Sequence, residues 1–144
     1  MCMLFFIGTN KELPKIPFNK ATPALNTAAI TTDQRPVKKH FSFPYVTYIG
    51  SDQKCGCGFQ GGPVQDEDMS AAMGILASGP ENRASLVEFI REHLADHAHV
   101  EIYGCWAEDY GEEKEYEAEI TLQDILAKEF SFEERGLYSV KIGK

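Results

Sequence analysis

The sequence predicts one globular α+β domain spanning residues 1–144, with a mixed or mainly antiparallel sheet of about five to six strands and about two to four helices. Two observations carry this prediction. Strand-like and helix-like segments are interspersed without regular alternation, so too few strand–helix units are present for a doubly wound parallel fold. The length of 144 residues and the 43% content of hydrophobic residues are those of one domain with a substantial core.

Six stretches are predicted as strands because they are rich in apolar, β-branched or aromatic residues. The first is apolar on both alternating faces, which is typical of a central strand covered on both sides. The second has the character of an edge strand. The fourth and fifth flank a turn at 109–113 and are predicted to form a β-hairpin. The six are Cys2–Gly8, Ala24–Ile30, Tyr45–Ile49, Val100–Ala107, Lys114–Thr121 and Leu137–Ile142.

Helical spacing of apolar residues is clearest between Pro80 and about His97. Ser78 and Glu81 form a capping-box pattern at the start of that segment. Three shorter helices are predicted from caps and from acids in the first turn. They are a helix capped by Asp33 that runs to His40, a helix over Asp66–Ala77, and a helix that starts at Thr121 with Asp124 and runs to Lys128.

The chain is acidic, with a formal net charge of −8 from 14 Lys and Arg against 22 Asp and Glu. An acidic protein repels phosphate backbones, and the basic cluster from Arg35 to His40 is too small for a nucleic-acid footprint. No apolar run approaches the ~18 residues that a membrane helix needs, and the apolar start lacks the basic region of a signal peptide. We therefore expect a cytoplasmic protein without nucleic-acid or membrane contact, whose four cysteines are thiols or metal ligands.

The segment Cys55-Gly56-Cys57-Gly58-Phe59 is the most unusual feature of the sequence. It follows a predicted strand, where binding loops often lie, and its glycines allow the backbone to adopt positive φ and bend tightly. Three interpretations stay open. The segment is a structural turn with two small buried thiols, a two-thiolate site for a soft metal such as zinc, or a reactive thiol site.

Other residues could complete such a site. Cys2 and Cys105 are weaker candidate metal ligands, and Cys2 lies near the loop if the first and third strands are antiparallel. His40 is a candidate catalytic partner for Cys55 or Cys57. The segment Gly56–Gly61 also matches G-x-G-x-x-G. A proline and an acidic run follow it where a nucleotide site needs a helix N-terminus, so no cofactor site is predicted.

Two further patterns carry ionisable side chains. His93 and His97 are four residues apart, so they would share one helical face, a spacing that can clamp a metal ion. The alternative is that these imidazoles interact with the helix dipole near the C-terminus of the helix. Glu115, Glu117 and Glu119 alternate along the fifth strand and place three carboxylates on one face. That face is either solvated or a surface for a basic partner. No specific protein partner, small ligand or oligomeric state is indicated.

Several short motifs in the first 60 residues occur together. They are Met1-Cys2 at the start of a strand, Lys39-His40-Phe41 followed by Pro44, Tyr48-Ile49-Gly50-Ser51, and the Cys55–Phe59 segment. In these motifs the chain resembles a small family of uncharacterised bacterial proteins. The resemblance implies a bacterial source and makes the cysteine loop a family feature. It implies no activity, ligand or catalytic residue.

The leading hypothesis is a small cytosolic protein whose functional site is the Cys-x-Cys loop, binding a soft metal or another ligand without turnover. A thiol enzyme or redox protein that uses Cys55 or Cys57 is the first alternative. A protein-interaction module that uses an acidic hairpin is the second alternative.

Overall fold

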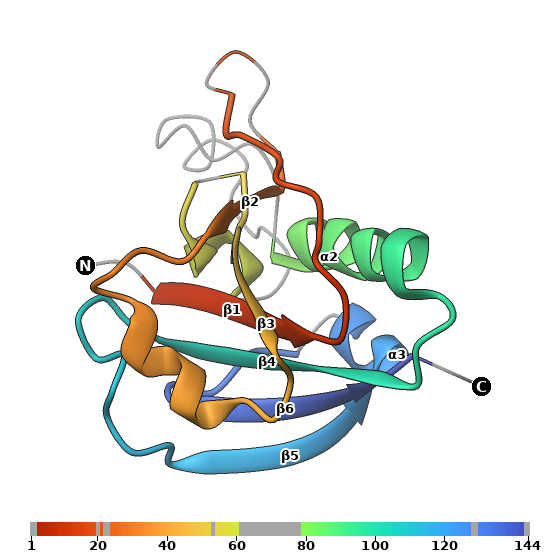
Figure 1. Ribbon diagram of the computed structural model, residues 1–144. Coiled ribbons are helices and arrows are strands. Elements are labelled where there is room, and N and C mark those ends of the chain that lie inside the picture. Colours follow the sequence, from red (N-terminus) through yellow and green to blue (C-terminus); the bar gives the residue numbers. More distant parts are fainter. Residues whose placement is uncertain are drawn as a thin grey trace.

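The computed structural model describes residues 3–19, 21, 24–52, 54–60, 79–127 and 130–142. These residues form an α+β domain around one six-stranded sheet, with the strand order β2-β3-β1-β4-β6-β5 (Figure 1). All neighbouring strands are antiparallel except β5 and β6, which are parallel. The predicted fold class is therefore confirmed. The strands are β1 (Met3–Thr9), β2 (Asn26–Ala29), β3 (Tyr45–Gly50), β4 (His99–Trp106), β5 (Tyr116–Thr121) and β6 (Gly136–Lys141).

Strand β1 has the central place that its sequence predicts. It pairs with β3 on one side and β4 on the other, and its side chains are buried on both faces. Phe5 and Ile7 belong to the larger hydrophobic cluster, whereas Phe6 belongs to a second cluster on the opposite face. Strand β2 lies at one edge of the sheet, as its sequence predicts.

The predicted hairpin between the fourth and fifth strands is wrong, because β6 lies between β4 and β5. The exposure of the two strands explains this order. Strand β6 is buried over most of its length, whereas β5 is mostly exposed and suits the edge. Parallel pairing of β5 with β6 requires a crossover, which contains helix α3 (Leu122–Leu126). The predicted capping box at Thr121 and Asp124 is present at the start of α3.

Helix α2 (Gly79–Leu94) lies on the larger cluster, with α3 on the same side of the sheet (Figure 1). Leu86, Ile90 and Leu94 are fully buried, as the helical spacing of apolar residues predicts. The helix ends at Leu94, three residues before the predicted end. The predicted cap at Ser78 and the predicted helix over 66–77 lie outside the described residues. In the described part of the chain, no helix combines the length and apolar character needed to cross a bilayer.

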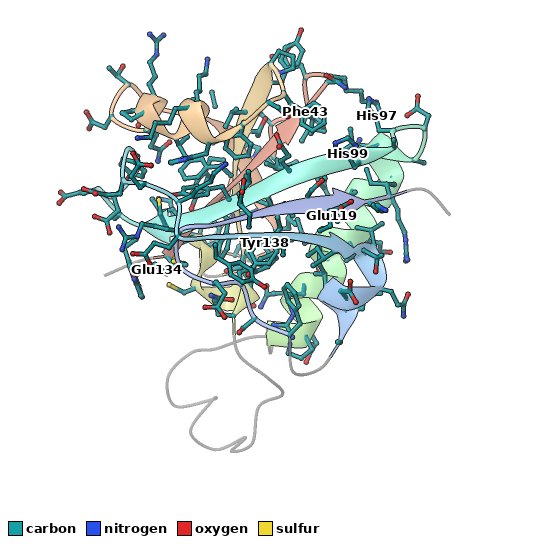
Figure 2. All side chains as sticks on the ribbon, turned by 90° about the horizontal axis from the view of Figure 1, so that it is seen from below. Phe43, His97, His99, Glu119, Glu134 and Tyr138 are labelled. Carbon is teal, nitrogen blue, oxygen red and sulfur yellow. The ribbon has the colours of Figure 1, made fainter. Side chains whose placement is uncertain are left out.

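The opposite face of the sheet is covered by η1 (Arg35–His40), a 3₁₀ helix that buries Val37 and His40. Seen from below, η1 (orange) lies on one side of the strands and α2 (green) on the other (Figure 2). The predicted cap by Asp33 is wrong, because the N-cap is Gln34 without a side-chain cap. Gln34 instead exchanges two hydrogen bonds with Thr31, which closes the turn before the helix.

Candidate functional site

The segment after β3 is closed by Ser51, which bonds to both sides of the cysteine turn. The Ser51 N–H and hydroxyl both donate to the Cys55 carbonyl, at 2.8 and 2.7 Å. The same hydroxyl accepts from the Gly58 N–H at 3.1 Å. The Asn26 side chain on edge strand β2 donates to the Ser51 carbonyl at 2.9 Å. One serine therefore fixes the path of the backbone on either side of Cys57.

The glycines of the turn serve close packing. The positive φ in this segment belongs to Lys54, at 75°. Neither Gly56 nor Gly58 has a φ in the left-handed region, so the expectation of positive φ at these glycines is wrong. A Cβ at Gly56 would overlap the Phe5 ring and lie 2.9 Å from the Met3 carbonyl oxygen. A Cβ at Gly58 would overlap the Ser51 hydroxyl. Gly56 and Gly58 therefore allow the backbone of the turn to pack directly against β1 and against the Ser51 side chain.

The two thiols lie on η2 (Gly56–Phe59), a single 3₁₀ turn, with Cys55 as its N-cap residue and Cys57 inside it. Both side chains are half-buried and reduced. The Met3 N–H donates to Cys57 Sγ at 3.3 Å, and Cys57 packs against the larger hydrophobic cluster. This hydrogen bond fixes the orientation of the Cys57 side chain. In metal sites, hydrogen bonds from neighbouring groups fix the orientation of the ligating side chains in the same way. The fold thus presents two thiols on a fixed turn.

The other two predicted ligands have different placements. Cys2 lies outside the described residues, but β1 is antiparallel to β3, which is the arrangement that brings the start of β1 toward the loop. Cys105 pairs with Leu4 on β1 and is buried in the cluster on the opposite face from Cys57. Burial raises the pKa of the Cys105 thiol to about 12, with the nearby Asp109 and Glu134 carboxylates adding to the increase. The structure does not bring Cys105 to the turn.

His40, the candidate partner for a loop cysteine, also lies on the face opposite η2. Its ring stacks on Tyr103 with centroids 4.1 Å apart, and its Nε2 lies 3.1 Å from the Tyr110 carbonyl oxygen. Burial lowers the pKa of His40, and the hydrogen bond to Tyr110 offsets part of that decrease. The structure therefore places His40 in the packing of η1, away from Cys55 and Cys57.

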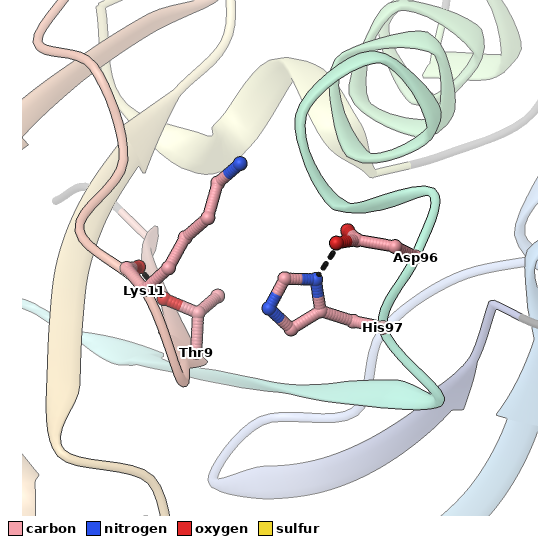
Figure 3. A network of polar contacts seen from close by, with 4 residues as sticks. All are labelled: Thr9, Lys11, Asp96 and His97. Carbon is pink, nitrogen blue, oxygen red and sulfur yellow. Dashed lines mark hydrogen bonds and ion pairs between the residues drawn. The ribbon is translucent and has the colours of Figure 1, made fainter.

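The histidines at the end of α2 do not share a helical face, because the helix stops at Leu94. His93 lies on the helix with its ring 4.7 Å from that of Phe89. His97 lies in the following turn, where its Nδ1 is 3.0 Å from Asp96 Oδ1 (Figure 3). Hydrogen bonds from its own backbone and from His97 lower the pKa of the Asp96 carboxyl.

The acidic face of β5 is partly neutralised by neighbouring cations. Glu115 precedes the strand and pairs with Arg135, Glu117 pairs with Lys114, and Glu119 pairs with Lys141 at 3.6 Å. Glu117 and Glu119 line a shallow hollow of about 330 Å³ on this face of the sheet. Glu117 and Glu119 therefore lie on β5, the edge strand of the sheet, which pairs with β6.

Two buried polar residues near the turn, Arg83 and Asp52, have no counterpart in the sequence prediction. Arg83 on α2 is fully buried and donates to the carbonyls of Phe59, Ile125 and Ala127, at 2.8, 3.0 and 3.2 Å. Arg83 shares a helical face with Leu86 and Ile90. A cation at an apolar position of the helix was therefore the sequence signal that could have predicted its burial. This arginine joins η2, α2 and α3 through one side chain.

Asp52 is the second of these buried polar residues. Its side chain is 9% exposed, its N–H donates to Asn82 Oδ1 at 3.2 Å, and neither carboxylate oxygen has a hydrogen-bond partner among the described residues. Burial raises the pKa of the Asp52 carboxyl, and the Glu81 carboxylate adds to the increase. The sequence offered no signal for this residue, because nothing local separates a buried aspartate from one in an exposed turn.

Comparison with known proteins found no relative of this chain. The chain matches no family model, no curated protein and no solved structure. The resemblance to a bacterial family therefore stays a prediction. Within the described residues, no group of three or more His, Cys, Asp or Glu side chains converges in a way that could hold a metal ion. The thiol pair on η2 is thus described by its own geometry alone.

Proposed function

We propose that this protein binds a soft metal ion, with zinc as the first candidate, through the thiolates of Cys55 and Cys57. One observation carries the proposal: both thiols lie on a single turn whose backbone is fixed by Ser51 and whose Cys57 sulfur is held by the Met3 N–H. Soft thiolates select zinc and Cu(I) over hard cations. A turn that is already ordered loses little conformational entropy when it binds an ion.

Two thiolates supply half of a tetrahedral zinc shell. Water or a further ligand from outside the described residues would occupy the other positions, which makes this an open site. The half-buried position of both thiols leaves an approach for the ion. Zinc binding would release protons from the thiols, so affinity should increase with pH.

A zinc titration against a chromophoric chelator tests the proposal on freshly reduced protein. Wild type should bind one zinc per chain, and the double variant Cys55→Ser/Cys57→Ser should lose that binding. Cys105→Ala is the matched control, because it removes a thiol on the opposite face of the sheet and should bind zinc as wild type does. Reduced wild type that takes no zinc from the chelator would refute the proposal.

Thiol reactivity at Cys57 is the second candidate function. It rests on the same hydrogen bond from Met3, which points a donor at one sulfur, and on a second thiol two positions away that could resolve an oxidised form. Alkylation of Cys57 should then be faster than that of a model thiol peptide at the same pH. Equal rates would exclude it, and protection of both thiols by added zinc would favour metal binding.

The proposal includes the cytosol as the compartment of action. A reducing compartment keeps cysteines as thiols, which is the state that metal binding requires. The acidic character of the chain, with a net charge of −8, supports a role without nucleic acid.

A further inference from the structure

A hollow of about 280 Å³ lies at the edge of the sheet where β2 stops short. Strand β2 pairs with β3 only as far as the pair between Ala29 and Thr47. Tyr45 and Val46, which begin β3, therefore extend beyond β2 and line one wall of the hollow. The loop that follows β1 and helix η1 contribute the remaining walls. The hollow is thus lined by the loop after β1, the end of β2, helix η1 and the start of β3.

Three cations and one carboxylate line this hollow. Lys15 comes from the loop after β1, Arg35 and Lys38 come from η1, and Glu12 is the one acid among the lining residues. Residues i and i+3 of a 3₁₀ helix eclipse one another, so Arg35 and Lys38 lie on the same face, away from buried Val37. In the described part of the chain, none of the three cations takes part in an ion pair.

The charge of the hollow is opposite to that of the protein as a whole, which is −8. Like charges gathered on one surface repel each other, and a bound anion relieves that repulsion. A guanidinium matches the oxygens of phosphate or carboxylate with two parallel hydrogen bonds, and lysine adds a mobile point charge. A phosphomonoester carries a charge of about −1.5 to −2 near pH 7, which suits three cations against one carboxylate.

Tyr45 adds an aromatic wall. It is 44% exposed and is one of two large hydrophobic side chains, in the described part of the chain, with so much surface in solvent. An exposed ring beside cations offers a stacking face to a planar group on a bound ligand. The volume of the hollow is near the lower limit of small-molecule sites, which suits a small ligand.

We infer that this hollow binds a small phosphomonoester, with Arg35, Lys38 and Lys15 on the phosphate and the Tyr45 ring against a planar part of the ligand. The site is separate from the thiol turn, so the inference goes beyond the proposed metal binding. It also gives a role to the basic cluster from Arg35 onward, which is too small to bind nucleic acid.

The test is a chemical-shift titration of the ¹⁵N-labelled protein with phenyl phosphate, which carries a phosphate and a planar ring, at physiological salt. Saturable shifts should appear at the start of β3 and in η1. Lys38→Ala should weaken binding about tenfold, because it removes a charge-assisted hydrogen bond. Tyr45→Ala should weaken phenyl phosphate but leave inorganic phosphate unchanged.

Lys39→Ala is the matched control, because Lys39 is exposed on the same helix and does not line the hollow. It should change the affinity less than twofold if the site is specific. Equal weakening by the two lysine variants, or no saturable shift with wild type, would overturn the inference. Benzoate binding as tightly as phenyl phosphate would overturn the phosphate assignment. Tighter binding of a single-stranded oligonucleotide would overturn the small-ligand assignment.

Discussion

The backbone N–H of Met3 donates a hydrogen bond to the sulfur of Cys57, at 3.3 Å, across a separation of 54 residues. The bond joins the start of the central strand to the turn that carries both candidate ligands. It also makes Cys57 a structural acceptor as well as a candidate metal ligand. The side chain at position 57 is therefore expected to matter for stability even without metal.

Cys57→Ala removes the acceptor and leaves the Met3 N–H without its partner. We expect a loss of about 1–2 kcal/mol in the free energy of unfolding, measured by urea denaturation in the presence of a chelator. Cys57→Ser is the comparison, because its hydroxyl can accept the same hydrogen bond, and it should lose less. Equal losses for the two variants would show that the hydrogen bond contributes nothing.

Ser51→Ala should open the turn. The variant loses the hydroxyl that donates to the Cys55 carbonyl and accepts from Gly58, so about 1–3 kcal/mol of stability should be lost. Zinc affinity should fall as well, because the turn would no longer be held before binding. Ser85→Ala removes an exposed hydroxyl on α2 and should change neither quantity. Unaltered zinc affinity in Ser51→Ala would contradict the role of the clamp.

Arg83→Met should destabilise the fold strongly. The variant keeps an apolar side chain of similar length in the core but leaves the carbonyls of Phe59, Ile125 and Ala127 without this donor. We expect a loss of about 3 kcal/mol, measured by urea denaturation. Arg91→Met on the exposed side of the same helix should change stability by less than about 0.5 kcal/mol. Similar effects of the two substitutions would contradict the anchoring role of Arg83.

Asp52 should make stability depend on pH. Burial raises its folded-state pKa above the ordinary value of 3.8. Between pH 3.8 and that higher pKa the folded protein holds the proton more tightly than the unfolded chain, so stability falls as the pH rises through this range. Below pH 3.8 the carboxyl is protonated in both the folded and the unfolded state, and the cost disappears. Asp52→Asn should therefore be more stable than wild type by about 1 kcal/mol at pH 7.

The difference between Asp52→Asn and wild type should shrink toward zero as the pH of the urea titration is lowered below 3.8. Asp33→Asn, in an exposed turn, is the control and should show no such gain at pH 7. A variant at position 52 that is less stable than wild type at neutral pH would mean that the carboxylate has a stabilising partner in the folded protein.

The sequence was sufficient for features that depend on local pattern. The two apolar faces of β1 predicted its central position, and Thr121 with Asp124 predicted the start of α3. Strand order was harder, because β4 and β5 are neighbours in sequence and a hairpin is the simplest connection. The apolar character of β6 was the physical signal that places it inside the sheet, and it outweighs that proximity.

The candidate site was predictable only in part. The cysteines were recognisable in the sequence, but the hydrogen bonds that fix the turn were not. Ser51, Asn26 and Met3 make those bonds through tertiary contacts. The role of Gly56 also depends on distant packing, since the Phe5 ring occupies the place of its absent side chain. Contacts between remote segments leave no periodic trace in a sequence.

Zinc K-edge absorption spectroscopy of the loaded protein tests the central claim most directly. The account predicts two sulfur neighbours per zinc, at about 2.3 Å, together with lighter ligands. In Cys55→Ser/Cys57→Ser the sulfur neighbours should disappear, and in Cys105→Ala they should remain. A zinc shell of nitrogen and oxygen only in wild type, or sulfur neighbours that persist in the double variant, would contradict binding at the turn.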